Sequence, residues 1–514
     1  MFLAEQSVPS WVMVDGAGRI WWISVDESSP WASGALIVRT VARWPKPRPT
    51  PETQGRGRTG TGLRKPLVPK ESSAVHGRQR MLIRNATILS MDPAIGDLDR
   101  GDLLLDGELI TAVGTDLDPG EPVTEVDATG RIAIPGLIDT HRHMWQAVLR
   151  GCAPHHTLMD YFSHILGGLG RLVTPDDVYL GNLLSAYGAL NAGVTTVQDI
   201  SNINSTPGHT EAIVAALRES GLRAVFAYGK DTPDGFASDK WLPDYVREVR
   251  ERLLPDDDAL VTMALVIEEG TDEEERRNWS LARELDVPVA RHMAAYQPGD
   301  RPLRRLAELG VLQPCTTFIH GVGLSVDELR IIADYGNLSI SPAIELAMGI
   351  GLPPFAAAAE AGLRPSLGVD AEVTVAADMF GQMRSAFQIS RYASAPYAVR
   401  DILEFATING ARTLGMADRI GSLTPGKQAD LVLLRADQPG TAPVYDPYST
   451  VVLGMDSAHV EAVLVAGEPI KWNGELRADT APVVGKAVDV RDWLVAAGHR
   501  LTTGSSRPRT VSWG

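Results

Sequence analysis

The chain has 514 residues, 44% of them hydrophobic, and carries a formal net charge of −16. Such a length allows about two to four domains, or one large barrel with an appended layer, and the acidic balance argues against a general nucleic-acid-binding protein. No apolar run approaches the roughly 18 residues of a membrane span, and the two cysteines, Cys152 and Cys315, are too far apart for a CxxC site. We therefore expect a cytoplasmic protein that binds neither membrane nor nucleic acid.

Residues 1–80 differ in composition from the rest of the chain and contain five of the eleven tryptophans. The stretch WVMVDGAGRIWWISV predicts a short hairpin around Asp15-Gly16. The next stretch, WPKPRPTPETQGRGRTGTGLRKPLVPKESS, is rich in Pro, Gly and Arg and is typical of a disordered basic linker. We interpret residues 1–80 as an N-terminal extension that the chemistry does not require.

Short strands separated by turn residues occur in two regions, 81–134 and 418–476. In the first, turns at Asp106-Gly107 and Ala128-Thr129-Gly130 suggest an antiparallel sheet. ADLVLLRA and VEAVLVAGEPI have the same pattern in the second. We expect the two regions to pack together as one small composite β-sandwich, followed by a C-terminal tail over 477–514.

Residues 135–417 alternate between strands and helices, the pattern of a parallel α/β domain. The strand candidates are AIPGLIDTHRH, VTTVQDIS, LRAVFAYG, ALVTMALV, VPVARH, CTTFIH, NLSISP and RPSLGVD. Capping residues begin two of the helices, Thr174 with Asp177 and Ser325 with Glu328. Eight β/α units over about 280 residues fit a (β/α)₈ TIM barrel, with a doubly wound sheet as the alternative.

Polar side chains stand at the C-terminal ends of the predicted strands, where such a barrel builds its active site. His141 and His143 end strand one, and the alternation of a strand points them the same way and Arg142 the other way. The other candidates are His292 after strand five, His320 after strand six, Glu345 after strand seven and Asp370 after strand eight. Alone, a histidine pair could equally be an ordinary surface or core feature. Three imidazoles and a carboxylate, however, suit a divalent cation and leave one position for water.

Four segments together resemble the amidohydrolase superfamily: PGLIDTHRHMWQ, FIHGVGLSVDEL, LGVD and ATINGARTLGMADRIGSLTPGKQADLVLL. The branch they resemble holds triazine hydrolases, cytosine deaminase-like enzymes and adenosylhomocysteine deaminases, and the resemblance runs from about Met81 to Leu476. It implies a barrel with a composite β-sandwich, a homodimer, and one Zn²⁺, or alternatively Fe²⁺, that activates a water molecule. By position it implies the metal ligands His141, His143, His292 and Asp370, with His320 beside the water or substrate.

The chemistry of the residue types agrees with these roles. Asp370 would bind the metal and accept a proton from the water. His320 would polarise the group under attack or stabilise the developing charge. The structural alternatives are a core histidine bonded to backbone for His320 and a helix N-cap for Asp370.

Two departures from the family pattern narrow the interpretation. Dinuclear members commonly carry a carboxylated lysine on strand four, and ALVTMALVIEEG has none, so we expect a single metal. Deaminases of this branch usually have a glutamate three residues after the strand-five histidine, where this chain has Ala295. Glu345 is our first candidate for the missing catalytic acid–base group and Glu268 the second. For each, an ordinary surface or structural glutamate is the alternative.

Residues after the barrel strands are candidates for the substrate-binding walls, where they could stack on and hydrogen-bond to a planar heterocycle. These are Trp145, His155, His156, Asn202 and Tyr296. For the histidine-dense segment GCAPHHTLMDYFSH, an ordinary helix with a polar face is an equal alternative.

The sequence thus predicts a metal-dependent amidohydrolase that hydrolyses a C–N bond of a small molecule, with deamination of an amino-substituted N-heterocycle as the first hypothesis. The second hypothesis keeps the metal site but uses it for dehydration, cyclisation or displacement of another leaving group. The third is a barrel that has lost catalysis and acts as a binding protein.

Overall fold

The computed structural model describes residues 10–14, 20–24, 37–40, 80–230, 244–295, 297 and 299–503, and it divides the chain into two units, Met1–Arg64 and Lys65–Gly514. In the smaller unit, β1 (Ser10–Val14), β2 (Ile20–Ser24) and β3 (Ile37–Thr40) form an antiparallel sheet. The pairing of β1 with β2 confirms the predicted hairpin. The predicted basic linker lies outside the described residues.

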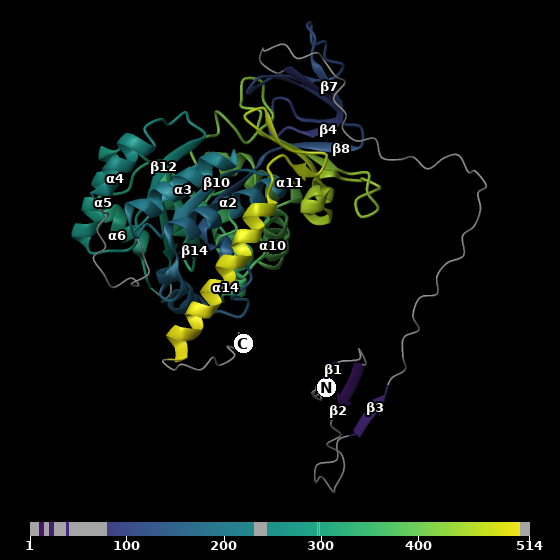
Figure 1. Ribbon diagram of the computed structural model, residues 1–514. Helices are drawn as coiled ribbons and strands as arrows, with labels where there is room; N and C mark the ends of the chain where they lie inside the picture. The colour runs from purple at the N-terminus through teal and green to yellow at the C-terminus, as the bar shows by residue number, and fades with distance from the viewer. Residues whose placement is uncertain are drawn as a thin grey trace, which may run out of the picture. The chain divides into compact units, whose positions relative to one another are not determined.

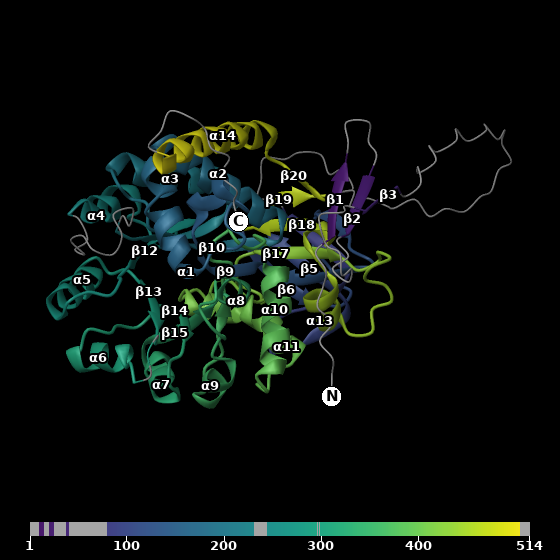
Figure 2. The same cartoon turned by 90° about the horizontal axis from the view of Figure 1, so that it is seen from below.

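The larger unit contains the predicted barrel (Figures 1 and 2). Eight parallel strands follow one another in chain order around it: β9 (Leu137–Arg142), β10 (Val194–Ser201), β11 (Arg223–Tyr228), β12 (Val261–Val266), β13 (Val289–Ala294), β14 (Thr316–Val322), β15 (Gly336–Ile340) and β16 (Ser366–Leu367). The ring closes where the Asp370 N–H donates to the His141 carbonyl at 2.7 Å and the His143 N–H donates to the Asp370 carbonyl at 3.1 Å. All eight strand predictions are confirmed.

Helices surround these strands, as Figure 2 shows. They are η1 (Met144–Leu149), α1 (Leu158–Asp160), η2 (Tyr161–Leu166), η3 (Leu169–Leu172), α2 (Pro175–Asn191), α3 (Pro207–Ser220), α4 (Tyr245–Glu248), η5 (Val249–Leu253), α5 (Asp272–Glu284), α6 (Pro302–Leu309), α7 (Val326–Tyr335), α8 (Pro342–Ala347), α9 (Phe355–Glu360), α10 (Met379–Tyr392), α11 (Val399–Phe405) and α12 (Ile408–Thr413). The hydroxyls of Thr174 and Ser325 accept from the N–H groups of Asp177 and Glu328, which confirms both predicted caps.

The barrel interior is a packed apolar core. Side chains such as Ile138, Ile200 and Val266 fill it, and Ala411 and Leu414, in and just after α12, join the same cluster. The histidines and Asp370 predicted at the strand ends stand at the carboxyl ends of the strands around this core.

The second sheet combines strands from both flanks of the barrel region. Its order is β20 (Glu475–Leu476), β19 (Glu468–Trp472), β18 (Val460–Val465), β17 (Leu431–Arg435), β8 (Arg131–Pro135), β4 (Arg80–Leu89), β5 (Asp97–Asp106) and β6 (Leu109–Gly114), with β7 (Thr124–Asp127) also paired to β4. The predicted antiparallel pairing is wrong for two strand pairs, because β7 and β8 both run parallel to β4. The Ala128–Gly130 turn does not reverse the chain into a hairpin. It passes the chain from the first half of β4 to the second.

The two faces of this sheet pack differently. On β8 and β17, Ala133, Leu431 and Leu433 belong to a core within the sheet, whereas the alternate residues, Ile134 and Val432 among them, pack with the barrel. Because side chains alternate between the two faces of a strand, one face of β8 and β17 packs against the barrel.

Gly136 joins β8 to β9, and so joins the two sheets. A Cβ at this position would lie 2.0 Å from Oγ1 of Thr195, so the passage requires glycine.

Three short helical turns, α13 (Pro447–Ser449), η6 (Thr450–Gly454) and η7 (Ser457–His459), precede β18, and one long helix, α14 (Ala481–Thr503), follows β20. Helix α14, yellow in Figures 1 and 2, lies along α2 and occupies much of the region predicted as a tail. Among the described residues, no helix is long and apolar enough to cross a membrane.

Candidate metal centre

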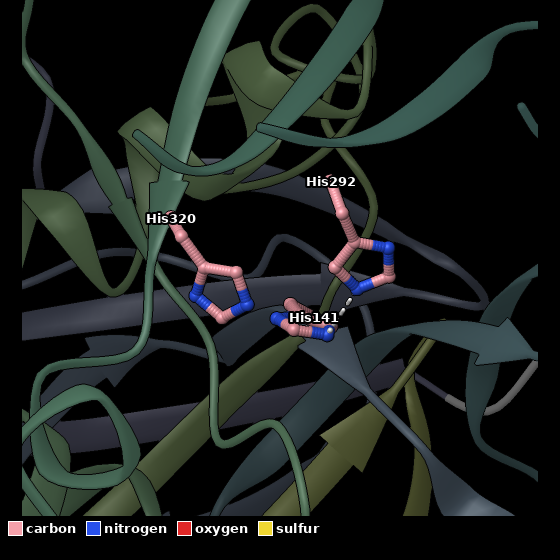
Figure 3. Close-up of side chains that lie close together, drawn as sticks. All are labelled: His141, His292 and His320. Atoms are coloured by element: carbon pink, nitrogen blue, oxygen red, sulfur yellow. Dashed lines mark hydrogen bonds between the residues drawn. The ribbon is translucent and has the colours of Figure 1, made fainter. Parts of the chain in front are cut away.

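Four histidines and one aspartate from four different strands meet at the carboxyl end of the barrel. Figure 3 shows His141, His292 and His320 turned toward one another. Nε2 of His141 lies 3.3 Å from Nε2 of His143 and 3.4 Å from Nε2 of His292. Oδ1 of Asp370 lies 3.6 Å from Nε2 of His141 and 3.5 Å from Nε2 of His143. These residues could hold a metal ion.

The separations fit a small divalent cation. Tetrahedral Zn²⁺ with Zn–N bonds of about 2.0–2.1 Å requires neighbouring ligand atoms about 3.3–3.4 Å apart. The measured separations of 3.3–3.6 Å lie at or just above that value. Nitrogen and oxygen atoms this close to one another repel unless protons or a cation lie between them, so the cluster could hold a metal ion.

Hydrogen bonds on the far side of the rings fix which nitrogen faces the centre. Nδ1 of His143 donates to the Ile200 carbonyl at 2.8 Å, and Nδ1 of His292 donates to Oε1 of Glu268 at 2.6 Å. Each bond leaves the Nε2 lone pair of that ring directed inward. Carbonyl and carboxylate partners of this kind orient metal-ligating histidines.

Burial and the neighbouring imidazoles keep the rings of His141 and His143 neutral. Burial, together with the neighbouring imidazoles, lowers the pKa of His141 well below its usual value, and lowers that of His143 to about 3. Burial also disfavours the charged form of His292, but the Glu268 carboxylate outweighs it and raises the pKa of that ring. Burial raises the pKa of Asp370 to about 6.

His320 adjoins this shell through Asp370. Its Nε2 lies 3.7 Å from Oδ2 of Asp370, and its Nδ1 donates to Oε1 of Glu345 at 3.0 Å. The same Glu345 oxygen accepts the Ser341 N–H at 2.9 Å. His320 and Asp370 both have left-handed backbone, with φ of 70° and 69°. Non-glycine residues adopt this conformation at a cost, and such strain is concentrated at functional sites.

Comparison with known proteins agrees with this geometry. Residues 132–470 match the amidohydrolase family. The chain belongs to the amidohydrolase family. A 5'-deoxyadenosine deaminase from Methanothermobacter thermautotrophicus is 30% identical over 76% of this chain and 95% of the relative. A 5-methylthioadenosine/S-adenosylhomocysteine deaminase from Desulforudis audaxviator is 28% identical over 76% of this chain and 93% of the relative.

Solved structures show the same architecture. A zinc-bound adenosine deaminase from Xanthomonas campestris superposes with a TM-score of 0.71 at 26% identity, covering 82% of this chain and 99% of that protein. A zinc-bound atrazine chlorohydrolase from Arthrobacter aurescens gives 0.72 at 24% identity, covering 80% of this chain and all of the other, and supports the fold alone.

A cavity of about 600 Å³ opens beside the cluster of histidines and Asp370. His143, His292, His320 and Asp370 are among its lining residues. Leu158, Tyr161, Phe162, Met348 and Ile350 form an apolar wall, and Glu269, Asp300, Arg301 and Arg305 provide polar groups. Three of the cavity-lining residues, Leu158, Tyr161 and Phe162, belong to the histidine-dense segment after strand one.

The other predicted wall residues lie elsewhere or are not described. Trp145 is buried, and its Nε1 donates to Oδ1 of Asn202 at 3.0 Å. His155 is exposed and His156 half-buried, and the described lining of the cavity contains none of these four residues. Tyr296 lies outside the described residues. Substrate binding by these residues remains a prediction.

Ala295 occupies the position three residues after His292 where related deaminases usually have a glutamate. It follows β13, and its N–H donates to the Val322 carbonyl at 2.9 Å. The side chain is a methyl group, so no carboxylate occupies this position. Glu268 is held by His292, and Glu345 by His320 and Ser341.

Proposed function

We propose that this amidohydrolase hydrolyses a C–N bond of a small molecule and that its reaction is deamination of an amino-substituted N-heterocycle. The single observation that carries the proposal is the cluster around Nε2 of His141, which has the Nε2 atoms of His143 and His292 and Oδ1 of Asp370 within 3.3–3.6 Å, beside a cavity. The deaminase relatives support the choice of reaction.

The metal ligands proposed are His141, His143, His292 and Asp370, with Zn²⁺ preferred and Fe²⁺ as the alternative. The zinc in the related adenosine deaminase supports that preference. A divalent cation at these side chains would lower the pKa of a water molecule toward about 7 and so supply hydroxide at neutral pH.

Asp370 and His320 would accept and donate the protons that the reaction moves. Asp370 has a second oxygen, Oδ2, facing His320, so it can accept the proton of the attacking water while Oδ1 serves the metal. Glu345 holds His320 with Nε2 facing the centre and stabilises positive charge on that ring. His320 can therefore donate to the substrate atom on which negative charge develops.

Ammonia release tests the proposal. Zinc-loaded protein should release ammonia from at least one member of a panel of aminopurines, aminopyrimidines and aminotriazines, and an Asp370→Asn variant should not. The absence of ammonia from every substrate would refute deamination.

A second function is favoured by Ala295, because the acid that usually protonates the leaving amine is missing at that position. The same centre would then displace a better leaving group, or dehydrate or cyclise its substrate. Release of chloride or methanol from chloro- or methoxy-substituted heterocycles, without ammonia from the amino analogues, would establish it.

Metal analysis separates both enzymes from a non-catalytic binding protein. The enzymes should retain about one equivalent of metal, whereas protein that binds neither Zn²⁺ nor Fe²⁺ when offered would exclude both. The homodimer also remains a proposal, to be tested by light scattering.

A further inference from the structure

Arg142 stands between the two β9 histidines, but its side chain points away from the metal centre into the protein. It is fully buried, with no exposed surface. Its Nε donates to Oδ2 of Asp139 at 2.7 Å, and its Nη1 donates to Oε1 of Glu372 at 3.1 Å. Nη2 donates to the Ala377 carbonyl at 3.1 Å. All three nitrogens of the guanidinium therefore donate hydrogen bonds, and Nη1 also reaches the Ser185 hydroxyl at 3.5 Å.

The two carboxylates belong to the segments that carry metal ligands. Oδ1 of Asp139 accepts the N–H of His141 at 3.2 Å and the N–H of Val369, next to Asp370, at 3.0 Å. Glu372 lies two residues beyond Asp370 and also accepts from Ser185 on α2 and from Arg150. Arg142 thus connects the end of β9 to the segment that follows β16.

No polar atom of Arg142, Asp139 or Glu372 is left unpaired. A buried ion pair of this kind contributes little net stability compared with apolar packing, but it fixes geometry, because each partner needs the others in place. The two connected segments supply His141, His143 and Asp370, which are three of the four proposed ligands. A lysine can replace the charge of Arg142 but cannot donate in the three fixed directions of the planar guanidinium.

We propose that Arg142 is a positioning residue that sets the distance between the His141–His143 pair and Asp370, and thereby sets the affinity of the centre for its metal. The inference rests on the proposed metal site. It goes beyond that site by assigning part of the metal affinity to a side chain that never touches the metal.

The test is the Zn²⁺ affinity of full-length Arg142→Lys, measured by competition with a chromophoric chelator, together with its melting temperature without metal. Arg223→Lys is the matched control. Arg223 is 3% exposed, and its Nε and Nη2 donate to Asp430 at 2.9 and 3.0 Å, but it stands at the first residue of β11, away from the centre. Both variants remove a buried guanidinium fork and keep the charge.

Arg142→Lys should weaken Zn²⁺ binding by about 10- to 100-fold, the usual effect of removing a partner that orients a ligand. Arg223→Lys should bind like wild type even if its melting temperature falls equally. Wild-type affinity in Arg142→Lys, or an equal loss in both variants, would overturn the inference.

Glu372→Gln provides a second route if Arg142→Lys does not fold. It keeps an oxygen for Arg142 but loses the charge, and it should weaken Zn²⁺ binding in the same direction; unchanged affinity would overturn the inference. Wild-type protein that binds no Zn²⁺ would instead refute the metal site itself, so the two failures are distinguishable.

Discussion

Glu345 accepts a hydrogen bond from Nδ1 of His320 at 3.0 Å, while Nε2 of the same ring faces Oδ2 of Asp370 at 3.7 Å. The carboxylate is therefore linked to Asp370 through the imidazole of His320. Glu345 lies on α8, just after the seventh barrel strand, and is the subject of the first prediction.

Glu345→Gln should lower kcat by about 10²-fold, the scale of general acid–base catalysis, because a neutral amide cannot stabilise positive charge on His320. Metal content should not change, since Glu345 contacts none of the four proposed ligands in the described hydrogen bonds. Steady-state kinetics and metal analysis measure the two effects. Glu328→Gln is the control, because Glu328 is equally buried but serves the start of α7. An unchanged kcat in Glu345→Gln would remove the residue from the mechanism.

Glu268→Gln should weaken Zn²⁺ binding by about 10- to 100-fold, because the carboxylate orients His292 and makes it a better donor. Chelator competition at pH 8 gives the affinity. Glu269→Gln, at the next position and also on the cavity wall, should bind Zn²⁺ normally. If the two variants bind alike, Glu268 does not support the ligand.

Zn²⁺ affinity should be constant at high pH and fall as the pH is lowered through the raised pKa of His292 and then through the pKa of Asp370, with the uptake of about two protons by pH 5. Affinity falls with falling pH because the ligands bind metal only when they are deprotonated. The pKa of His292 is raised and that of Asp370 is about 6, so both take up protons in this range. His141 and His143 stay neutral, because burial lowers their pKa values, that of His143 to about 3. Affinities at pH 8, 7, 6 and 5 measure the slope, and an uptake of four protons would contradict this order.

Gly368→Ala should lower both stability and Zn²⁺ affinity. A Cβ at Gly368 would lie 2.6 Å from Cβ and 2.9 Å from the carbonyl oxygen of His141, so β9 would have to move. Such overpacking costs about 1–3 kcal/mol of unfolding free energy. Denaturant melts and chelator competition measure the two quantities.

The control is Gly485→Ala in α14, where no atom beyond the adjacent residues and the helix's own backbone lies within 4 Å of the new methyl group. It should stabilise the helix by about 0.5–1 kcal/mol and leave Zn²⁺ binding unchanged. Normal binding by Gly368→Ala would show that the barrel absorbs the methyl group without moving His141.

The sequence was informative about the barrel because short, buried, parallel strands ending in polar residues carry a local signal. His141 and His143 were placed on one side of β9 by the alternation of a strand, and Arg142 on the other, as the structure shows. The direction of β7 and β8 was not readable, because a turn such as Ala128–Gly130 can reverse a chain or merely shift it along one neighbour. Strand pairing depends on distant partners.

The hydrogen-bond partners of His292 and His320 could not be predicted from the sequence either. Glu268 and Glu345 were considered only as replacements for the acid missing at Ala295, because nothing in a sequence shows which nitrogen of a distant histidine a carboxylate meets. Trp145 and Asn202 were each considered only as possible wall residues, and the hydrogen bond between them depends on the path of η1. Such contacts arise only when the whole barrel closes.

The pairing of β8 with β17 has a consequence during synthesis. Residues 131–135 pair with residues 431–435, roughly 300 positions later in the chain. At about 5–20 residues per second, the ribosome needs about 15–60 s to produce the second strand after the first. Until then one edge of β8 is an unpaired, apolar strand of the kind that aggregates. Chains truncated before Leu431 should therefore be insoluble, even though they contain every proposed metal ligand.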